Sequence, residues 1–186
     1  MNREQWLNEA ANLIWHEILE PHTAQQKPKF RVSVAPLAQS TLGQCHVTAI
    51  SEDQTNEIFI AAHTNDSMTI LATLQHELIH ASDDCQSGHK NHFAKLARMS
   101  GLEGKLTQTH ASTELNQRLQ TIVDLLDIIP HANLTIPPKQ KGRNNNKITC
   151  NACGFQANLS RKWADQILPD FECPCCQSRD TETVTK

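Results

Sequence analysis

The segment His76-Glu-Leu-Ile-His80 constrains this chain more than any other stretch of its 186 residues. Two histidines four positions apart lie one turn apart on the same face of an α-helix, so both imidazoles can reach one Zn²⁺ ion. The glutamate beside the first histidine lies about 100° around the helix, where it can accept a proton from water bound to that ion. The pattern therefore predicts a helix with a metal centre on one face, with His76 and His80 as ligands and Glu77 as the catalytic base.

The remainder of this helix, expected to begin after Asp66 or Ser67 and to run to about Ser82, supports the same interpretation. On a helical wheel the apolar residues gather opposite the two histidines: Ile70, Leu71, Leu74, Leu78 and Ala81. Such a helix packs its apolar side on a core and presents the histidines to a cleft. A core histidine would lie on the apolar side instead, and an ordinary pair of surface histidines is the remaining alternative.

A catalytic zinc site needs a third protein ligand and an open coordination position. The downstream candidates are Asp83, Asp84, His89, His92 and Glu103. The longer metzincin pattern requires glycine at position 83 and histidine at position 86, and this chain has neither, so that family is excluded. Glu103 would serve as an acidic third ligand, whereas His89 follows a short loop that lets the chain turn back toward the metal.

A second metal-binding pattern lies near the end of the chain, where two CxxC pairs are separated by nineteen residues. Each pair directs two thiolates at one centre, and two pairs complete a tetrahedral Cys₄ zinc site. A redox CxxC motif would not explain a second copy. We therefore predict a structural zinc ribbon that folds only with its metal and whose ligands are Cys150, Cys153, Cys173 and Cys176. Cys175 is a spare thiol that can compete for the metal, and Cys45 and Cys85 are expected to be buried or loop thiols.

The charge of the chain is distributed unevenly, although the formal total is only −3. Residues 128–164 carry six basic and no acidic side chains, whereas both flanking regions are acidic. The Pro- and Asn-containing part of this basic region has no apolar periodicity and indicates a linker. We expect one domain over residues 1–130, a basic linker over 131–147 and the ribbon over 148–186. The basic side chains, with one tryptophan, suit phosphates and base stacking: Lys139, Lys141, Arg143, Lys147, Arg161, Lys162 and Trp163. The alternative is a solvated linker beside a passive structural unit.

Apolar spacing predicts an α+β domain with a small antiparallel sheet. Helices are expected over residues 3–20, 67–82, 91–99 and from 112 or 113 to 130, and strands over 30–34, 45–50 and 57–61. No apolar run approaches the length of about 18 residues that a membrane helix needs. With no secretory signal and an odd number of cysteines, the sequence favours reduced thiols and a cytoplasmic protein, nucleoid-associated in a bacterium.

Three segments together resemble the SprT-like zinc metallopeptidases, whose animal members are the Spartan proteases: His76-Glu-Leu-Ile-His-Ala81, Ser87-Gly-His-Lys-Asn-His-Phe93 and Gly101-Leu-Glu-Gly-Lys105. That family combines a HExxH helix, a variable loop, and a Gly-His pair followed four residues on by phenylalanine. The resemblance covers roughly residues 5–110 and departs at Lys90, where the family often has a small residue. It implies a zincin-like fold with His89 as the third zinc ligand, Phe93 as a packing residue and no ligand role for His92.

The resemblance also implies a function. It predicts a zinc-dependent protease with one catalytic and one structural Zn²⁺ ion, acting on proteins that are associated with DNA or crosslinked to it. The expected partners are protein substrates and DNA, single-stranded or in protein complexes, and no membrane. One alternative is a non-catalytic module that binds DNA or the transcription machinery through the ribbon. Another is a zinc hydrolase that acts on a substrate other than a peptide.

Overall fold

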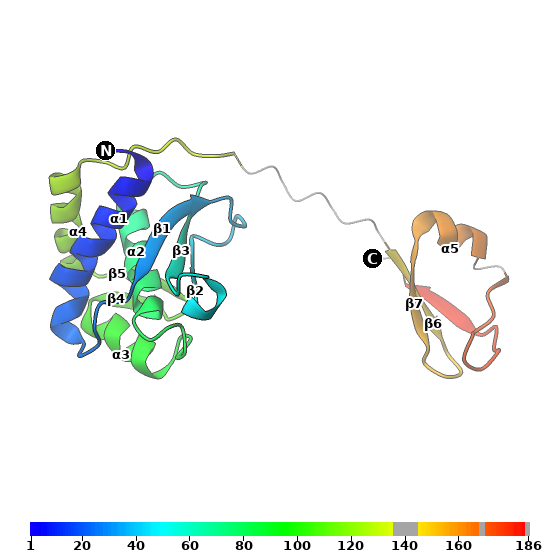
Figure 1. Cartoon of the computed structure of the whole chain (residues 1–186). Helices are drawn as coiled ribbons and strands as arrows, with labels where there is room; N and C mark the ends of the chain where they lie inside the picture. The colour runs from blue at the N-terminus through cyan, green and yellow to red at the C-terminus, as the bar shows by residue number, and fades with distance from the viewer. Residues whose placement is uncertain (136–144, 168–169, 185–186) are drawn as a thin grey trace. The chain divides into compact units, whose positions relative to one another are not determined.

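The computed structural model describes residues 1–135, 145–167 and 170–184, which fall into two compact units, Met1–Ile136 and Pro137–Lys186 (Figure 1). The predicted linker, residues 131–147, contains the division between them. Both units combine strands with helix, so the predicted α+β class is confirmed. In the part of the chain that the structure describes, no helix is long and apolar enough to cross a membrane.

The sheet of the first unit has three strands, β1 (Phe30–Ala35), β2 (Gly43–His46) and β3 (Asn56–Ala61), in the order β1-β3-β2. β3 pairs antiparallel with β2 and parallel with β1, so the sheet is mixed and the prediction of an antiparallel sheet was wrong. The chain reverses direction at each connection, but β3 inserts between its two predecessors and therefore runs alongside β1 in the same direction. Alternation of apolar and polar residues marks a strand without fixing its neighbours.

Strand β2 also ends earlier than predicted, at His46 rather than at residue 50. The chain next forms a 3₁₀ turn, Thr48–Ile50. Two side chains explain the departure: Asn56 donates to the His46 carbonyl oxygen at 3.0 Å, and the Asp84 carboxylate accepts from the Thr48 backbone amide at 2.7 Å. The Asn56 contact holds the last residue of β2 against β3, and the Asp84 contact then directs the chain toward the loop after the second helix.

Three helices enclose the core: α1 (Arg3–Ile14) and α2 (Ser67–Ala81) pack on the sheet, and α4 (Thr113–Leu126) packs on these two helices. Figure 1 shows them side by side, and each contacts the other two. Each starts at a side-chain cap, Asn2, Asp66 and Ser112 respectively, as expected for residues that accept from the free amides of the first turn. Their apolar faces form one continuous core with the buried face of β3.

Two helix ends differ from the prediction. The predicted helix over residues 3–20 is α-helical only to Ile14 and continues as a π-helical turn, Trp15–Leu19, and a short 3₁₀ turn. α4 ends at Leu126 rather than at Pro130, because Asp127 has a positive φ of 62°. The Asp127 carbonyl oxygen accepts a 2.9 Å hydrogen bond from the indole of the buried Trp6, which fixes this end against α1.

A hairpin that the sequence did not predict follows the third helix. α3 (Asn91–Met99) leads into β4 (Leu102–Lys105) and β5 (Gln108–Ala111), which pair antiparallel. Gly101 and Gly104 have φ of 91° and 84°, values that favour glycine. The hairpin has only one fully buried side chain, Leu102, so it lacks the apolar alternation that would have revealed it. It contacts α2 through β5.

The second unit is a three-stranded antiparallel sheet with one short helix. Its elements are β6 (Asn145–Cys150), β7 (Gln156–Ser160), α5 (Arg161–Ile167) and β8 (Thr181–Val184), and the strand order is β7-β6-β8. Among its described residues, the buried apolar side chains are Ile148, Cys150 and Cys173. Three side chains cannot form a core that stabilises a fold of this size, so the stabilising energy must come from another source.

Candidate metal centres

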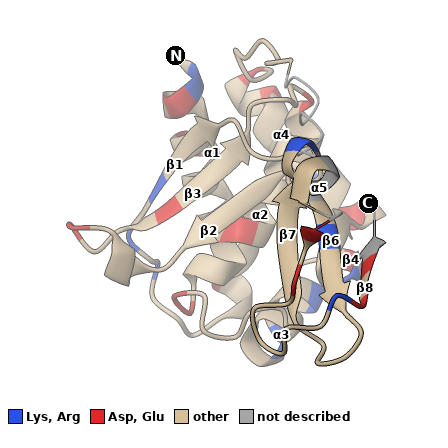
Figure 2. Cartoon of the chain, turned by 90° about the vertical axis from the view of Figure 1, so that its right-hand side faces the viewer, with Lys and Arg blue, Asp and Glu red and all other residues tan. Residues whose placement is uncertain are grey.

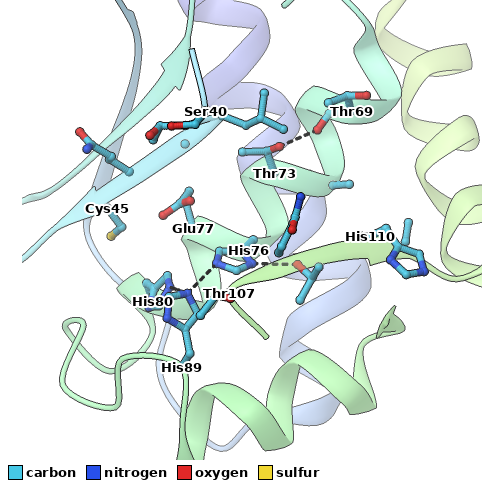
Figure 3. Close-up of a pocket in the computed structure, with 18 of the residues that line it drawn as sticks. Ser40, Cys45, Thr69, Thr73, His76, Glu77, His80, His89, Thr107 and His110 are labelled. Carbon is cyan, nitrogen blue, oxygen red and sulfur yellow. Dashed lines mark hydrogen bonds between the residues drawn. The ribbon is translucent and has the colours of Figure 1, made fainter. Parts of the chain in front are cut away.

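His76, His80 and His89 bring their ring nitrogens together at one point. His76 and His80 lie one turn apart on α2, and His89 lies in the loop that joins α2 to α3 (Figure 3). The Nε2 atom of His89 is 3.2 Å from that of His76 and 3.3 Å from that of His80. In a tetrahedral site with Zn–N bonds of about 2.0–2.1 Å, two ligand nitrogens lie roughly 3.3–3.4 Å apart. The three imidazoles therefore have the spacing of a metal site.

The buried Phe93 side chain holds these three imidazoles in place. Its ring stacks on His80 with centroids 4.4 Å apart, and it contacts His76 and His89 edge-on at 4.8 and 5.0 Å. Phe93 is 0% exposed, so the group rests directly on the apolar core. The packing role that the family resemblance implies for Phe93 agrees with these contacts.

A hydrogen bond fixes the orientation of one of the ligands. The Nδ1 atom of His76 lies 2.8 Å from the Thr109 hydroxyl on β5. A partner at Nδ1 leaves Nε2 free to bind a metal and orients the ring. No sequence pattern points to Thr109, because it lies 33 positions from His76 and only the unpredicted hairpin brings it close.

The three histidines are neutral at neutral pH. Burial, together with repulsion from the neighbouring imidazoles, lowers the pKa of His76 to about 3 and that of His80 to about 4. Burial also lowers the pKa of His89. A neutral imidazole offers the lone pair that metal binding requires, so the group is ready to coordinate an ion at neutral pH.

The Glu77 carboxyl faces a cleft of about 1190 Å³ that the three histidines also line. Figure 3 shows Glu77 beside the imidazoles, pointing to the same side of α2. The side chain is 6% exposed, and burial raises its pKa to about 8. A cation at the histidine group would lower that pKa again by favouring the charged carboxylate.

Strand β2 forms one wall of this cleft and lies very close to α2. A Cβ atom on Gly43 would come within 2.7 Å of both the Glu77 Oε1 and Thr73 Cγ2 atoms. Only glycine lets the strand approach the helix this closely. β2 pairs with β3 on one side only, so its other backbone edge is free of strand partners among the described residues. The opposite wall is β5, with Thr109 and His110.

The other candidate third ligands lie elsewhere. Glu103 is an exposed residue on β4, 3.8 Å from His110, and the Asp84 carboxylate accepts from Thr48. His92 contacts the Ser82 hydroxyl at 2.8 Å. Asp83 accepts a hydrogen bond from the Ser87 amide. Of the five candidates, only His89 joins His76 and His80 in a group that could hold a metal ion.

The second group that could hold an ion consists of cysteines in the C-terminal unit. The Sγ atoms of Cys150 and Cys176 are 3.6 Å apart, those of Cys153 and Cys173 are 3.5 Å apart, and all four lie within 4.8 Å of one another. Tetrahedral Zn–S bonds of about 2.3 Å place two sulfur atoms roughly 3.8 Å apart. The four thiols therefore suit a closed Cys₄ zinc site, and the exposed Cys175 is not part of the group.

The two CxxC turns have the same backbone geometry. In each, the amide of the residue after the turn donates to the carbonyl oxygen of the first cysteine at 2.8 Å, Gly154 to Cys150 and Gln177 to Cys173. That residue has a positive φ in both turns, 75° for Gly154 and 58° for Gln177. The repeated geometry makes each pair a half-site, and the two half-sites close on one centre.

The predicted nucleic-acid residues fall partly outside the described structure. Lys139, Lys141 and Arg143 lie there, whereas Lys147 lies on β6 and Arg161, Lys162 and Trp163 begin α5. Lys162 and Trp163 are exposed, and the Lys162 Nζ atom lies 5.4 Å from the Trp163 ring centroid. Figure 2 shows acidic as well as basic segments on this unit.

Among models of known protein families, curated proteins and solved structures, none matches this chain. The function is therefore inferred from the residues of the two centres.

Proposed function

We propose that the chain is a zinc-dependent peptidase of the SprT-like type, with a zincin-like catalytic unit. The observation that carries the proposal is the convergence of three neutral imidazoles beside a buried carboxyl group in one open cleft. Zinc held by His76, His80 and His89 would supply a Lewis acid that polarises a carbonyl group and makes water more acidic. A purely structural His₃ site would need neither the carboxyl of Glu77 nor an open cleft.

Glu77 is the proton carrier in this proposal. Its carboxylate accepts a proton from the attacking water and later delivers it to the leaving amine. The raised pKa of Glu77 shows that its surroundings favour the protonated form, and a neighbouring cation offsets this preference. The two influences together bring the pKa into the range that proton transfer in both directions requires.

An extended peptide is the substrate that best fits the cleft. The unpaired edge of β2 can hydrogen-bond a peptide as an added strand, and Gly43 brings that edge beside Glu77. A peptide bound there would run between β2 and β5 and past the three histidines. This wall favours a peptidase over a hydrolase of small non-peptide substrates, which would have no use for a strand edge.

The first experiment compares wild-type chain with Glu77→Gln, both fully loaded with zinc. We expect Glu77→Gln to keep its zinc and to lose at least about 10²-fold in turnover of an unstructured protein, the range typical of a removed general base. Glu103→Gln is a matched control, because this exposed glutamate belongs to neither metal group. An active Glu77→Gln enzyme would overturn the assigned role, and an inactive, zinc-loaded wild type would favour the non-catalytic binding module.

We further propose that the substrates are proteins attached to DNA or associated with it. The support is the exposed Lys162–Trp163 pair, which combines a cation for phosphate with a ring for stacking on a base. Removing a stacking aromatic costs about 1–3 kcal/mol per base. We therefore expect Trp163→Ala to weaken binding of single-stranded DNA by roughly tenfold.

The test measures binding of single-stranded DNA over a range of salt concentrations and cleavage of one protein presented free and crosslinked to DNA. Salt-dependent binding together with faster cleavage of the crosslinked form would support the DNA role. Equal cleavage of both forms would leave the peptidase and reduce the Cys₄ unit to a structural part. If the affinity for single-stranded DNA did not change with salt concentration, that result would contradict a contact with phosphate.

A further inference from the structure

Two cysteines that the proposed hydrolysis does not use lie side by side at the cleft. Cys45 belongs to the edge strand β2, and Cys85 lies in the loop that leads from α2 to His89. Their sulfur atoms are 3.5 Å apart, and both residues are partly buried and line the cleft. Cys45 is drawn in Figure 3, on the same side of the cleft as Glu77.

The backbone around Cys85 is strained in a way that fixes this contact. Asp84 and Cys85 are consecutive non-glycine residues with positive φ, 53° and 60°. Such conformations persist only where the surroundings hold them. Here the Asp84 carboxylate accepts from the Thr48 amide at 2.7 Å, and the Cys85 amide donates to the His80 carbonyl oxygen at 2.7 Å. These hydrogen bonds hold the loop beside the end of β2, with the thiol of Cys85 against that of Cys45.

The contact is close to the geometry of a disulfide. A disulfide needs a sulfur–sulfur distance of about 2.05 Å, so a movement of roughly 1.5 Å shared between strand and loop would close the bond. The two thiols differ in their setting, because Cys85 lies in a loop and Cys45 lies in a strand. The loop thiol, Cys85, is therefore the one that an oxidant reaches first, since exchange rates depend on access.

We propose that Cys45 and Cys85 form a reversible redox dithiol whose co-substrate is a low-molecular-weight disulfide. The Cys85 thiolate attacks one sulfur of that disulfide, whose S–S bond breaks and releases one small thiolate with the bonding electron pair. Cys45 then loses its proton to solvent and attacks the Cys85 sulfur of the mixed disulfide, which releases the second small thiolate. Two protein thiols are oxidised to one disulfide, and one small disulfide is reduced to two thiols.

The oxidised pair would tie together two parts of the cleft that are separate in sequence. β2 is the strand edge, and the loop of Cys85 continues into the third histidine, His89. A covalent link between them restrains both at once. A disulfide formed in this strained, partly exposed geometry is expected to be reduced again readily and not to be a permanent structural bond. This chemistry does not depend on peptide hydrolysis, so a failure of the proposed function leaves it standing.

The test uses the zinc-loaded, full-length wild-type chain and oxidised glutathione as the disulfide. Trypsin releases one peptide, residues 32–90, that contains both cysteines and no other, because no Lys or Arg intervenes before Lys90. After incubation, acid quenching and alkylation, we expect this peptide to be unalkylated and lighter by two hydrogen atoms. Reduced glutathione in excess should restore alkylation of both thiols.

Single variants separate the two roles. Cys45→Ser should leave glutathione on Cys85, because the second attack is missing, whereas Cys85→Ser should slow modification of residue 45, because the loop thiol that reacts first is missing. Cys175→Ser removes an exposed thiol of the other unit and should leave the 32–90 peptide behaving as in wild type. Two wild-type results would overturn the proposal: a 32–90 peptide that stays fully alkylated, or one that accumulates glutathione on Cys85 without closing the disulfide.

Discussion

The histidine group and the cysteine group both place ligand atoms at the spacing of a tetrahedral metal centre, but the chain builds them in different ways. The three histidines rest on Phe93 and on a core shared by α1, α2 and α4. The four cysteines lie in a unit whose described residues contain three buried apolar side chains. A fold with its own core can hold a metal site that opens to a cleft, whereas a unit without one must use its metal to fold.

The difference shows in exposure to solvent and in ligand number as well. The histidine group offers three potential ligands and faces an open cleft. The cysteine group offers four potential ligands, enough for a tetrahedral site without another partner. Three ligands with an open position are typical of catalytic zinc, and four closed ligands are typical of structural zinc.

Removal of zinc should have very different effects on the folding of the two units, and this is the largest difference we expect between them. A structural zinc contributes about 10–16 kcal/mol of apparent folding free energy in small domains, so we expect a strong chelator to unfold the C-terminal unit. The N-terminal unit should keep its helices, because its core does not include the metal. Hydrogen exchange checks this: the amides of β6 should lose protection while those of α2 keep theirs. Simultaneous unfolding of both units would contradict the comparison.

Phe93→Ala should lower the stability of the N-terminal unit, which has its own core. Truncating a buried phenylalanine costs about 3–5 kcal/mol, and here it also removes the support of all three imidazoles. We expect a lower free energy of unfolding of this unit, together with weaker zinc binding. Met99→Ala is the control, because Met99 ends the same helix and is 47% exposed. Denaturant unfolding and zinc titration measure the two effects, and an unchanged zinc affinity would show that Phe93 does not position the imidazoles.

Asp84→Asn should destabilise the N-terminal unit in a pH-dependent way. The hydrogen bonds from Thr48 and Asn56 hold the pKa of Asp84 below its usual value. The stabilisation is therefore present above pH 3.8 and is lost as the pH falls through the lower pKa of the folded state. We expect a loss of about 2 kcal/mol at pH 7, as for hydrogen bonds to a charged group, and convergence with wild type in acid. Urea unfolding at several pH values checks this, with Glu52→Gln as an exposed control.

The smallest effect we expect is from Thr109→Val, which removes the hydroxyl beside His76 and keeps the shape of the side chain. Loss of such a partner lowers metal affinity by about tenfold or somewhat more. The stability of the zinc-free unit should change little. Competition with a coloured chelator measures the affinity, and Thr107→Val, in the turn before β5, is the matched control. Equal zinc affinities of the two variants would show that the Thr109 hydroxyl does not support metal binding.

Short-range patterns predicted much of both centres. His76, His80 and the two CxxC pairs follow from spacing, because a helical turn or a tight turn alone brings such neighbours together. The residues alone left the third ligand open between candidates such as His89 and Glu103, and only the family resemblance selected His89. Thr109 and Gly43 could not have been foreseen, because tertiary contacts place them at the site.

Tertiary contacts that no local pattern reveals also explain the errors in the predicted fold. Strand positions followed from alternating residues, yet the insertion of β3 between β1 and β2 made the sheet mixed. The short polar hairpin of β4 and β5 left no apolar pattern to find. Side-chain contacts made across the fold, such as that of Trp6 with the carbonyl of Asp127, set where α4 ends.

The hydrogen bond between His76 and Thr109 also has a consequence for the order of events during folding. It joins a helix to a hairpin that the chain forms 33 residues later, and the cleft further needs β2 ahead of both. Contacts this distant in sequence form late, because the chain must first close long loops. The first unit is therefore expected to acquire its metal after folding, whereas the cysteine pairs can capture an ion while their unit is still unfolded and fold around it.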